Sequence, residues 1–388
     1  MCIILTKTIK GEMKDMDFTM DDILNKSKIS SDNSTGMDFT IEDLLTTAKN
    51  NHSSDLHISA GIPPKMRIHG ELQTMPYPRL TAEDTVRLLK PVLDARTQKI
   101  LDEKGEVDFS HAIDSVGRFR VNIFKQKETL AAVMRIITTE IPDAHKLGVP
   151  QAVIDLTKRK RGLVLVTGPT GSGKSTTLAS LIDIINANKT SHIVTMEDPI
   201  EYLHTHKSCV VNQREIGLDT QSYGNALRAV LREDPDVILV GEMRDLDTIS
   251  TAITAAETGH LVFSTLHTIG ASATIDRIID VFPPHQQQQI RTQLGFVLEA
   301  VISQQLIPTS DGEGRVAAFE VMLATPAIKS LIRECKNHQI DSMVQINKKI
   351  GMQTMDDAIY DLFLRERINS KEALEFAVDP VAMEKKLF

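Results

Sequence analysis

The pattern of hydrophobic and polar positions changes once along the chain, near residue 138. Before that point, short runs alternate apolar with polar residues, as in residues 55–59 and 118–124. An alternation with a period of two is that of a half-buried strand. Between these runs, residues 82–93 have apolar positions at helical spacing. The pattern predicts a small α+β domain over residues 37–137.

Residues 138–148 contain Pro142 and Gly148 and have the composition of a linker. Beyond them, short runs that are apolar at every position are separated by helical patterns: residues 163–166, 192–196, 237–240 and 261–263. Strands that are apolar on both faces belong to a sheet that helices cover on both sides. The last part of the chain is helical in pattern, as in residues 356–365 and 370–376. We therefore expect an α/β domain over residues 149–388 with a helical C-terminal part.

A short near-repeat marks the N-terminal region. Residues 16–24 (MDFTMDDIL) recur almost unchanged as residues 37–45 (MDFTIEDLL), and the stretch SSDNSTG between them has linker composition. Each copy resembles a helix start, with a threonine as N-cap and acidic residues in the first turn. One copy is enough to begin the domain, so we expect residues 1–36 to form a flexible extension.

Composition narrows the class of protein. The 388 residues are 41% hydrophobic and 25% charged, which is ordinary for a globular chain. A formal net charge of −8, 4% aromatic residues and no Trp disfavour a nucleic-acid binder. The chain shows neither an apolar run near the roughly 20 residues of a membrane span nor the apolar core of a signal peptide. We expect a cytoplasmic protein without a nucleic-acid partner or direct membrane insertion.

Residues 168–175 (GPTGSGKS) match the phosphate-binding pattern GxxxxGK[ST], between a predicted strand and a predicted helix. Glycines let successive backbone N–H groups surround a polyphosphate, and the lysine reaches the β- and γ-phosphates. The serine hydroxyl can bind Mg²⁺, and the helix N-terminus favours negative charge. The pattern predicts a site for ATP and Mg²⁺ that is formed by Gly168, Pro169, Thr170, Gly171, Ser172, Gly173, Lys174, Ser175 and Thr176.

Carboxylates follow two other predicted strands. Glu242 comes just after residues 237–240, and Gly241 takes the position where a Walker B acid usually stands. A carboxylate there can polarise an attacking water or hold Mg²⁺ through water. Glu197, in residues 196–202 (MEDPIEY), follows the preceding strand. That acidic cluster either organises Mg²⁺ and water or caps a turn.

Histidines flank the last predicted strand, with His260 before it and His267 after it. A single histidine at a strand end is more often structural than functional. Two that flank one strand beside a phosphate-binding loop favour a functional role, because imidazole can donate a hydrogen bond to a γ-phosphate. We therefore expect both to belong to the nucleotide site.

These motifs occur in the order found in a known family. Residues 168–176 (GPTGSGKST), 196–202 (MEDPIEY), 234–245 (DPDVILVGEMRD) and 258–268 (TGHLVFSTLHT) resemble the Walker A, Asp box, Walker B and His box of the secretion-type ATPases. Within that superfamily, the chain resembles the PilT-type ATPases that retract type IV pili in twitching motility. Supporting stretches are VNQRE at 211–215, RAVLRED at 228–234 and GMQTMD at 351–356. The resemblance covers about residues 37–388.

The resemblance implies a PAS-like N-terminal domain, a RecA-like P-loop ATPase domain, and a homohexameric ring with nucleotide between the two domains. It assigns phosphate and metal binding to Lys174, Ser175 and Thr176, with Ser175 on Mg²⁺. It makes Glu242 the catalytic glutamate, Glu197 the Asp-box carboxylate, and His260 and His267 the histidines on the γ-phosphate side. Both carboxylates would reach the metal through water. The implied partners are the inner-membrane platform protein of the pilus and other pilus ATPases, at the inner face of the cytoplasmic membrane.

The resemblance also assigns two arginines before the linker. Arg118 (in GRFRVN) and Arg135 (in MRII) match the N-terminal arginines that close over the nucleotide. Their physical role would be that of arginine fingers, which neutralise charge on the transferring phosphoryl group. Without the resemblance, each is equally well explained as a solvated strand residue.

One motif departs from the family. Its C-terminal AIRNLIRE appears here as residues 327–334 (AIKSLIRE), with Lys329 and Ser330 at the changed positions. Lysine keeps the charge but loses the planar fork of arginine. We therefore expect ATP hydrolysis to survive, and any effect of the two changes to fall on the coupling to retraction.

The main rival is a pilus-extension or type II secretion assembly ATPase, which usually carries another N-terminal domain and a four-cysteine zinc insert. The cysteines of this chain, Cys2, Cys209 and Cys335, are too few and too far apart for that insert, so we expect no zinc. The motifs also allow a small-molecule P-loop kinase, which would need an acceptor, or a nucleotide-sensing scaffold that does not hydrolyse ATP.

Overall fold

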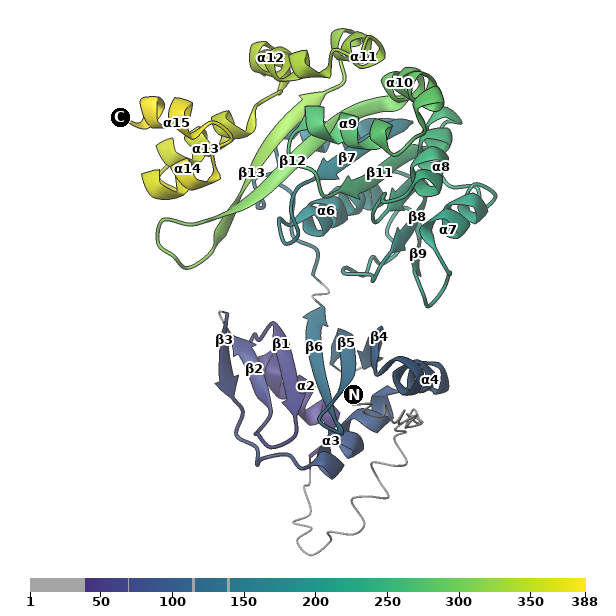
Figure 1. The fold of residues 1–388 in the computed structure, drawn as a ribbon, viewed down its shortest axis with the longest axis vertical. Coiled ribbons are helices and arrows are strands. Elements are labelled where there is room, and N and C mark those ends of the chain that lie inside the picture. The colour runs from purple at the N-terminus through teal and green to yellow at the C-terminus, as the bar shows by residue number, and fades with distance from the viewer. Residues whose placement is uncertain (1–38, 69, 114–115, 138–139) are drawn as a thin grey trace, which may run out of the picture. The chain divides into compact units, whose positions relative to one another are not determined.

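The computed structural model describes residues 39–68, 70–113, 116–137 and 140–388. Its internal contacts divide the chain into two compact units, with the boundary after Ile137 (Figure 1). None of the helices in these ranges is long and apolar enough to cross a membrane.

The first unit is a six-stranded antiparallel sheet in the order β3-β2-β1-β6-β5-β4. Its strands are β1 Asp55–Ser59, β2 Lys65–Ile68, β3 Glu71–Thr74, β4 Glu106–Ile113, β5 Gly117–Gln126 and β6 Thr129–Ile137. The helices that share its apolar core are α2 Ile41–Asn50, α3 Ala82–Leu89 and α4 Ala95–Lys104, with the short 3-10 helix η1 Lys90–Val92. The alternation predicted for residues 118–124 is confirmed, since Phe119, Val121 and Ile123 are fully buried.

Helix α2 begins where the second copy of the repeat predicts a helix. The backbone N–H of Asp43 donates to Thr40 Oγ1 at 3.3 Å, and the backbone N–H of Thr40 donates to the Asp43 carboxylate at 2.7 Å. This reciprocal pair satisfies N–H groups that have no partner within a helix start. The first copy of the repeat and the expected extension, residues 1–36, lie outside the described residues.

The second unit is built on a seven-stranded sheet in the order β13-β12-β7-β11-β10-β8-β9. Its strands are β7 Gly162–Thr167, β8 His192–Glu197, β9 Val210–Glu215, β10 Val237–Val240, β11 Leu261–Leu266, β12 Leu298–Pro308 and β13 Arg315–Leu323. All neighbours are parallel except β13, which runs antiparallel to β12. The runs predicted as buried strands are therefore confirmed as β7, β8, β10 and β11.

Helices cover both faces of this sheet, as its doubly apolar strands predict. One core contains side chains of α7 Tyr223–Val230, α8 Leu246–Glu257, α9 Ala271–Asp280 and α10 Pro284–Val297. The other contains side chains of α5 Gln151–Ile154, the 3-10 helix η2 Asp155–Lys158 and α6 Lys174–Asn188. The C-terminal part is helical as predicted, with α11 Pro326–Arg333, η3 Asn337–Gln339, α12 Ile340–Ile346, η4 Lys348–Ile350, α13 Met355–Leu364, α14 Ser370–Phe376 and α15 Pro380–Leu387.

Two features differ from the sequence expectation or go beyond it. Strands β12 and β13 form a hairpin that extends the parallel sheet, although the sequence pattern did not single them out. The segment expected as a linker, residues 138–148, is partly built into the second unit. Ala144, and Val149 just after the segment, are buried in the core that also contains α5 and α6. The apolar side chains of this stretch explain why it packs on the sheet instead of spanning open solvent.

Candidate active site

Parallel strands bring four of the predicted motifs to one edge of the second sheet. The loop of residues 168–173 follows β7, Glu197 ends β8, Glu242 follows β10 and His267 follows β11. These strands are neighbours in the order β7-β11-β10-β8, and all pairs are parallel. Their carboxyl ends therefore share one edge, which is where open α/β sheets bind ligands.

The loop of residues 168–173 leads directly into α6. Gly168, Gly171 and Gly173 have φ angles of 141°, 79° and 85°, which side-chain-bearing residues rarely adopt. Gly168 has a second requirement, because a Cβ there would collide with the carbonyl oxygen of Gln304. A loop of this course can turn successive N–H groups toward one anion, with the amino end of α6 beside it.

Lys174 is folded back onto this loop. Its Nζ donates to the carbonyl oxygens of Gly168 at 2.8 Å and Pro169 at 3.0 Å. Burial lowers the pKa of Lys174, although attraction to Glu242 and Glu201 opposes that effect. A phosphate would be a stronger partner than two neutral carbonyls, because a hydrogen bond between two charged groups is stronger. The position of Lys174 therefore suits the phosphate contact that the sequence predicts.

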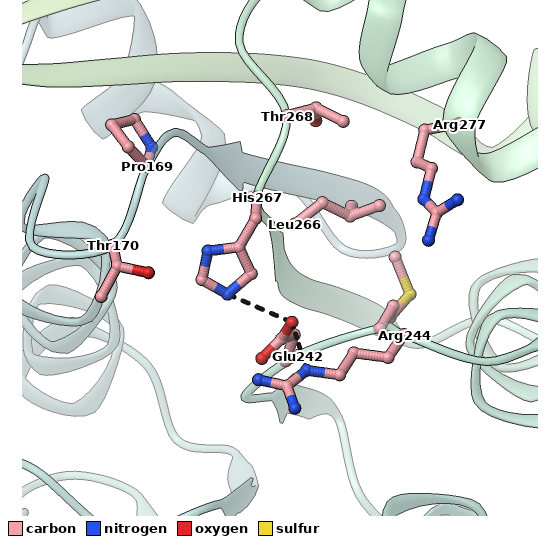
Figure 2. A pocket seen from close by; sticks show the side chains of 9 residues that line it. Pro169, Thr170, Glu242, Arg244, Leu266, His267, Thr268 and Arg277 are labelled. Carbon is pink, nitrogen blue, oxygen red and sulfur yellow. Dashed lines mark ion pairs between the residues drawn. The ribbon is translucent and has the colours of Figure 1, made fainter.

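Glu242 stands in a cavity of about 670 Å³ that also contains Thr170 and His267 (Figure 2). One carboxylate oxygen, Oε1, lies 2.6 Å from Nε of Arg244 and 3.1 Å from Nε2 of His267. Burial raises the pKa of Glu242, but the hydrogen bond from Arg244 and the charges of His267 and Arg244 outweigh burial and lower it. Glu242 is therefore an ionised carboxylate beside the phosphate-binding loop, as a residue that polarises water must be.

Glu197 lies at the same edge in different surroundings. The hydroxyl of Thr195 and the side-chain amide of Gln213 donate to its Oε1 at 2.6 Å and 3.1 Å. Part of the residue is exposed, yet the protein around its carboxylate raises the pKa to about 7, because desolvation outweighs these hydrogen bonds. The carboxylates of Glu242 and Glu197 therefore have pKa values shifted in opposite directions.

The residues at this edge fit a magnesium ion that nucleotide oxygens also bind. Ser175 and Glu197 line a small cavity of about 30 Å³ and offer the oxygen donors that Mg²⁺ prefers. Nowhere in the described part of the chain do three His, Cys, Asp or Glu side chains gather closely enough to hold a metal. That is compatible with Mg²⁺, which is commonly bound by one or two protein groups, water and substrate phosphates.

His260 is not part of this edge. It precedes β11, where its Nδ1 lies 2.8 Å from the carbonyl oxygen of Ala255 and 3.2 Å from Oγ1 of Thr258. Strand β11 separates it from His267, and a strand of that length spans roughly 20 Å. The prediction that both histidines face a γ-phosphate is therefore corrected for His260 within one chain. The motif spacing identifies the strand, but the strand direction decides which histidine reaches the site.

Arg118 and Arg135 lie in the first unit, on the sheet face opposite its apolar core. Arg135 Nε lies 3.0 Å from Oδ1 of Asp55, and the two residues are opposite each other on β6 and β1. Arg120, opposite Arg135 on β5, pairs with Asp108 at 2.6 Å. Arg118 is two residues before Arg120 and shares its face. This face is a row of arginines beside carboxylates.

Some residues around these groups were not singled out in the sequence. Arg244, two residues after Glu242, contacts its carboxylate locally, whereas Gln213 reaches Glu197 only because β9 lies beside β8. Thr176 Oγ1 lies 2.9 Å from the hydroxyl of Tyr202. Arg277 lines the Glu242 cavity from α9, outside every motif, so no local pattern could have identified it.

Comparison with known proteins gives a consistent family. A family model described as "Type II/IV secretion system protein" matches residues 31–374. The "Type IV pilus retractation ATPase PilT" of Pseudomonas aeruginosa is 48% identical over 328 residues, which are 84% of this chain and 95% of that protein. The "Type IV pilus ATPase PilU" of the same organism is 41% identical over 324 residues, 84% of this chain and 85% of that one.

A solved structure agrees with these relatives. The crystal structure of the pilus retraction motor PilT with bound ADP has a TM-score of 0.85 and 50% identity to this chain. The match covers 90% of this chain and 100% of that one, so it includes most of both units. The chain therefore belongs to the type II/IV secretion ATPase family, as an ATPase of the PilT type.

Proposed function

We propose that this protein hydrolyses ATP at the carboxyl edge of its seven-stranded sheet and uses the energy to retract type IV pili. The observation that carries the proposal is one cavity in which Thr170 of the phosphate-binding loop, Glu242 and His267 meet. A phosphate-binding loop alone indicates nucleotide binding. An ionised carboxylate beside it adds the group that hydrolysis needs.

The residues of the cavity divide the work. Lys174 and the loop N–H groups bind the β- and γ-phosphates. Glu242 orients the attacking water and accepts its proton, for which its lowered pKa keeps the carboxylate ionised. His267 contacts the Glu242 carboxylate and stands on the γ-phosphate side. Mg²⁺, when bound with ATP, neutralises charge on the phosphates; Ser175 would hold it directly, and Glu197 and Glu242 through water.

Arg118 and Arg135 complete the site from the first unit in this proposal. An arginine stabilises the charge of a phosphoryl group in the transition state. Because these arginines and Lys174 belong to different units, ATP would draw the units together, and its hydrolysis would release them. A homohexamer would turn this cycle into motion around a ring. The platform protein at the inner face of the cytoplasmic membrane, with other pilus ATPases, would receive that motion.

Retraction is preferred to extension because the similarity to a pilus retraction ATPase runs along most of the chain. The altered motif forms the start and body of α11. In that helix Ile328 and Ile332 are fully buried. Lys329 Nζ donates to the carbonyl oxygen of Phe296 at 3.2 Å and lies 3.5 Å from Oε1 of Glu299. The altered motif therefore keeps a charged contact that fastens α11 to α10 and β12. This contact supports an intact coupling element.

Deleting the gene tests the direction of work. We expect cells without this protein to keep or accumulate surface pili, and to lose twitching motility. Loss of surface pili would instead point to an extension ATPase. Phosphate release by the purified protein, with and without the platform protein, separates the motor from a nucleotide-sensing scaffold, which would bind ATP and release no phosphate.

A further inference from the structure

The cavity around Glu242 extends well beyond the phosphate-binding loop. Pro169 and Thr170 line one side, and Arg277 enters from α9 on the opposite side, with Glu242 and His267 between them (Figure 2). Its volume of about 670 Å³ is far more than a γ-phosphate occupies. The cavity therefore has room beside the place where the γ-phosphate would be cleaved.

Arg277 differs from the other cations near this cavity. Arg244 is paired with Glu242 at 2.6 Å, and Lys174 donates to the loop carbonyls. Within the described ranges, Arg277 makes neither a hydrogen bond nor an ion pair through its side chain, although Asp276 and Asp280 are on the same helix. Asp276 is instead engaged with the side-chain amide of Asn337 at 2.6 Å. An exposed guanidinium that faces a polar cavity in this way is suited to an anion.

We propose that Arg277 contacts the inorganic phosphate after cleavage and forms the exit side of the site. The inference rests on the proposed hydrolysis at Glu242. In that reaction, the water oxygen bonds to the γ-phosphorus and the bond to the bridging oxygen breaks, leaving its electron pair on ADP. The proton of the water passes to Glu242 and then to phosphate or solvent.

The geometry explains why the product, and not the bound nucleotide, is the ligand of Arg277. Pro169 and Thr170 of the phosphate-binding loop lie on one side of Glu242, whereas Arg277 stands on the other (Figure 2). The nucleotide phosphates would lie on the side of the loop. Once the bond breaks, the phosphate dianion is free to leave the loop. A planar guanidinium can bind two of its oxygens at once, which an ammonium cannot do.

Orthovanadate, a mimic of inorganic phosphate, provides the test. In Arg277→Gln, the vanadate concentration that halves ATP hydrolysis should rise about tenfold, since a hydrogen bond to a charged group is lost. Arg277→Lys should fall between this variant and the wild type. The half-inhibiting concentration of ADP should stay within about twofold of the wild-type value. Arg315→Gln, which removes an exposed arginine on β13, is the matched control and should leave both unchanged.

Several results would overturn the proposal. They are an unchanged vanadate curve in Arg277→Gln, a wild-type protein that vanadate does not inhibit, and equal shifts for vanadate and ADP, which would indicate a general distortion. Glu242→Gln measured alongside separates this inference from the proposed function. If Glu242→Gln stops hydrolysis while Arg277→Gln responds like the wild type, only the role of Arg277 fails. If Glu242→Gln hydrolyses normally, the assignment of the site fails first.

Discussion

The two sheets of this protein carry their charged groups in different ways. In the seven-stranded sheet, Glu242 and His267 each come directly after a parallel strand, so the order of motifs along the chain determines which groups meet. In the six-stranded sheet, Asp55, Arg120 and Arg135 are neighbours because of the antiparallel register. In the parallel sheet the charged side chains lie together at one edge, whereas in the antiparallel sheet they are distributed over one face.

This difference also affects how the charges are held. The pairs on the antiparallel face are ion pairs between opposite strands, of which Arg135 and Asp55 are one. Burial raises the pKa of Asp55, but hydrogen bonds from Ser54 and Arg135 outweigh it, and the pKa is lowered. At the parallel edge, Glu242 has a lowered pKa, whereas that of Glu197 is raised to about 7. The pKa values of these two carboxylates are therefore moved apart, as is common at sites of proton transfer.

The largest effect should come from the antiparallel face. Arg118→Ala and Arg135→Ala should each lower turnover by roughly 10³- to 10⁵-fold, the range found for arginine fingers. Arg120→Ala is the matched control, because Arg120 lies on the same face and pairs with Asp108. We expect it to keep turnover within a few-fold of wild type. Phosphate release at saturating ATP measures the effect, and the Tm reports whether each variant folds.

A double variant that folds and hydrolyses ATP normally would remove both arginines from the site. The face would then be a set of structural ion pairs. A loss of turnover in Arg120→Ala equal to that in the other variants would show that the charge of the whole face matters, not two positions.

The next largest effect is expected from the two histidines that flank β11. His267→Ala should lower turnover by roughly 10- to 100-fold, because it removes a partner that holds the Glu242 carboxylate. His260→Ala, at the other end of β11, should change turnover by less than about twofold, since its ring contacts the end of α8. Equal losses of turnover in the two variants would show that His260 also acts at a nucleotide site. It would then do so through a contact with another subunit.

A smaller effect should appear in stability against pH. Because the native state raises the Glu197 pKa from 4.5 to about 7, it holds this proton more tightly than the unfolded chain. The free energy of unfolding therefore falls as pH rises through that window. Glutamine cannot ionise. The free energy of unfolding of Glu197→Gln, taken relative to that of the wild type, should therefore rise by about 1–3 kcal/mol between pH 5 and pH 8.

Denaturation curves at both pH values, without Mg²⁺ or nucleotide, measure that difference. Glu313→Gln is a suitable control, because Glu313 is an exposed carboxylate that is not among the groups acting on Glu197. A variant that differs from wild type by the same amount at pH 5 and pH 8 would show that the Glu197 pKa is not raised.

The smallest effect is expected from deleting residues 1–36. The helix start at Thr40 and Asp43 and the contact of Phe39 with Tyr77, at a ring-centroid distance of 4.6 Å, remain in the shortened chain. Assembly, Tm and turnover should therefore stay at wild-type values in light scattering, thermal melts and phosphate-release assays. A truncated protein that aggregates or loses its oligomeric state would show that the deleted residues support the body.

The sequence predicts most of the parallel sheet and its edge, because each part depends on a local pattern. Apolar runs mark β7 and β10, and glycine spacing marks the loop before Lys174. Contacts across the fold could not be predicted in this way. Arg277 reaches the Glu242 cavity from α9 through tertiary packing. The hairpin of β12 and β13 joins the sheet beside β7, although it lies far from β7 in the sequence.

The antiparallel face was less predictable for a physical reason. Period-two alternation shows that Arg118 and Arg120 point away from the core, but both arginines satisfy it equally. Only the strand register assigns Asp108 to Arg120 and Asp55 to Arg135. The error for His260 has a related cause, since a motif that contains a whole strand includes groups from both edges of the sheet.

The most direct test measures nucleotide affinity and turnover in Lys174→Ala and Glu242→Gln side by side. In the proposed mechanism Lys174 contacts the phosphates of bound ATP, so its loss should weaken nucleotide binding by roughly 100-fold. In the same mechanism Glu242 acts on the attacking water, so Glu242→Gln should bind ATP within a few-fold of wild type and lose roughly 10²- to 10⁴-fold in turnover. An equal loss of nucleotide affinity in both variants, or wild-type turnover in Glu242→Gln, would contradict the assignment of this edge as the site of ATP hydrolysis.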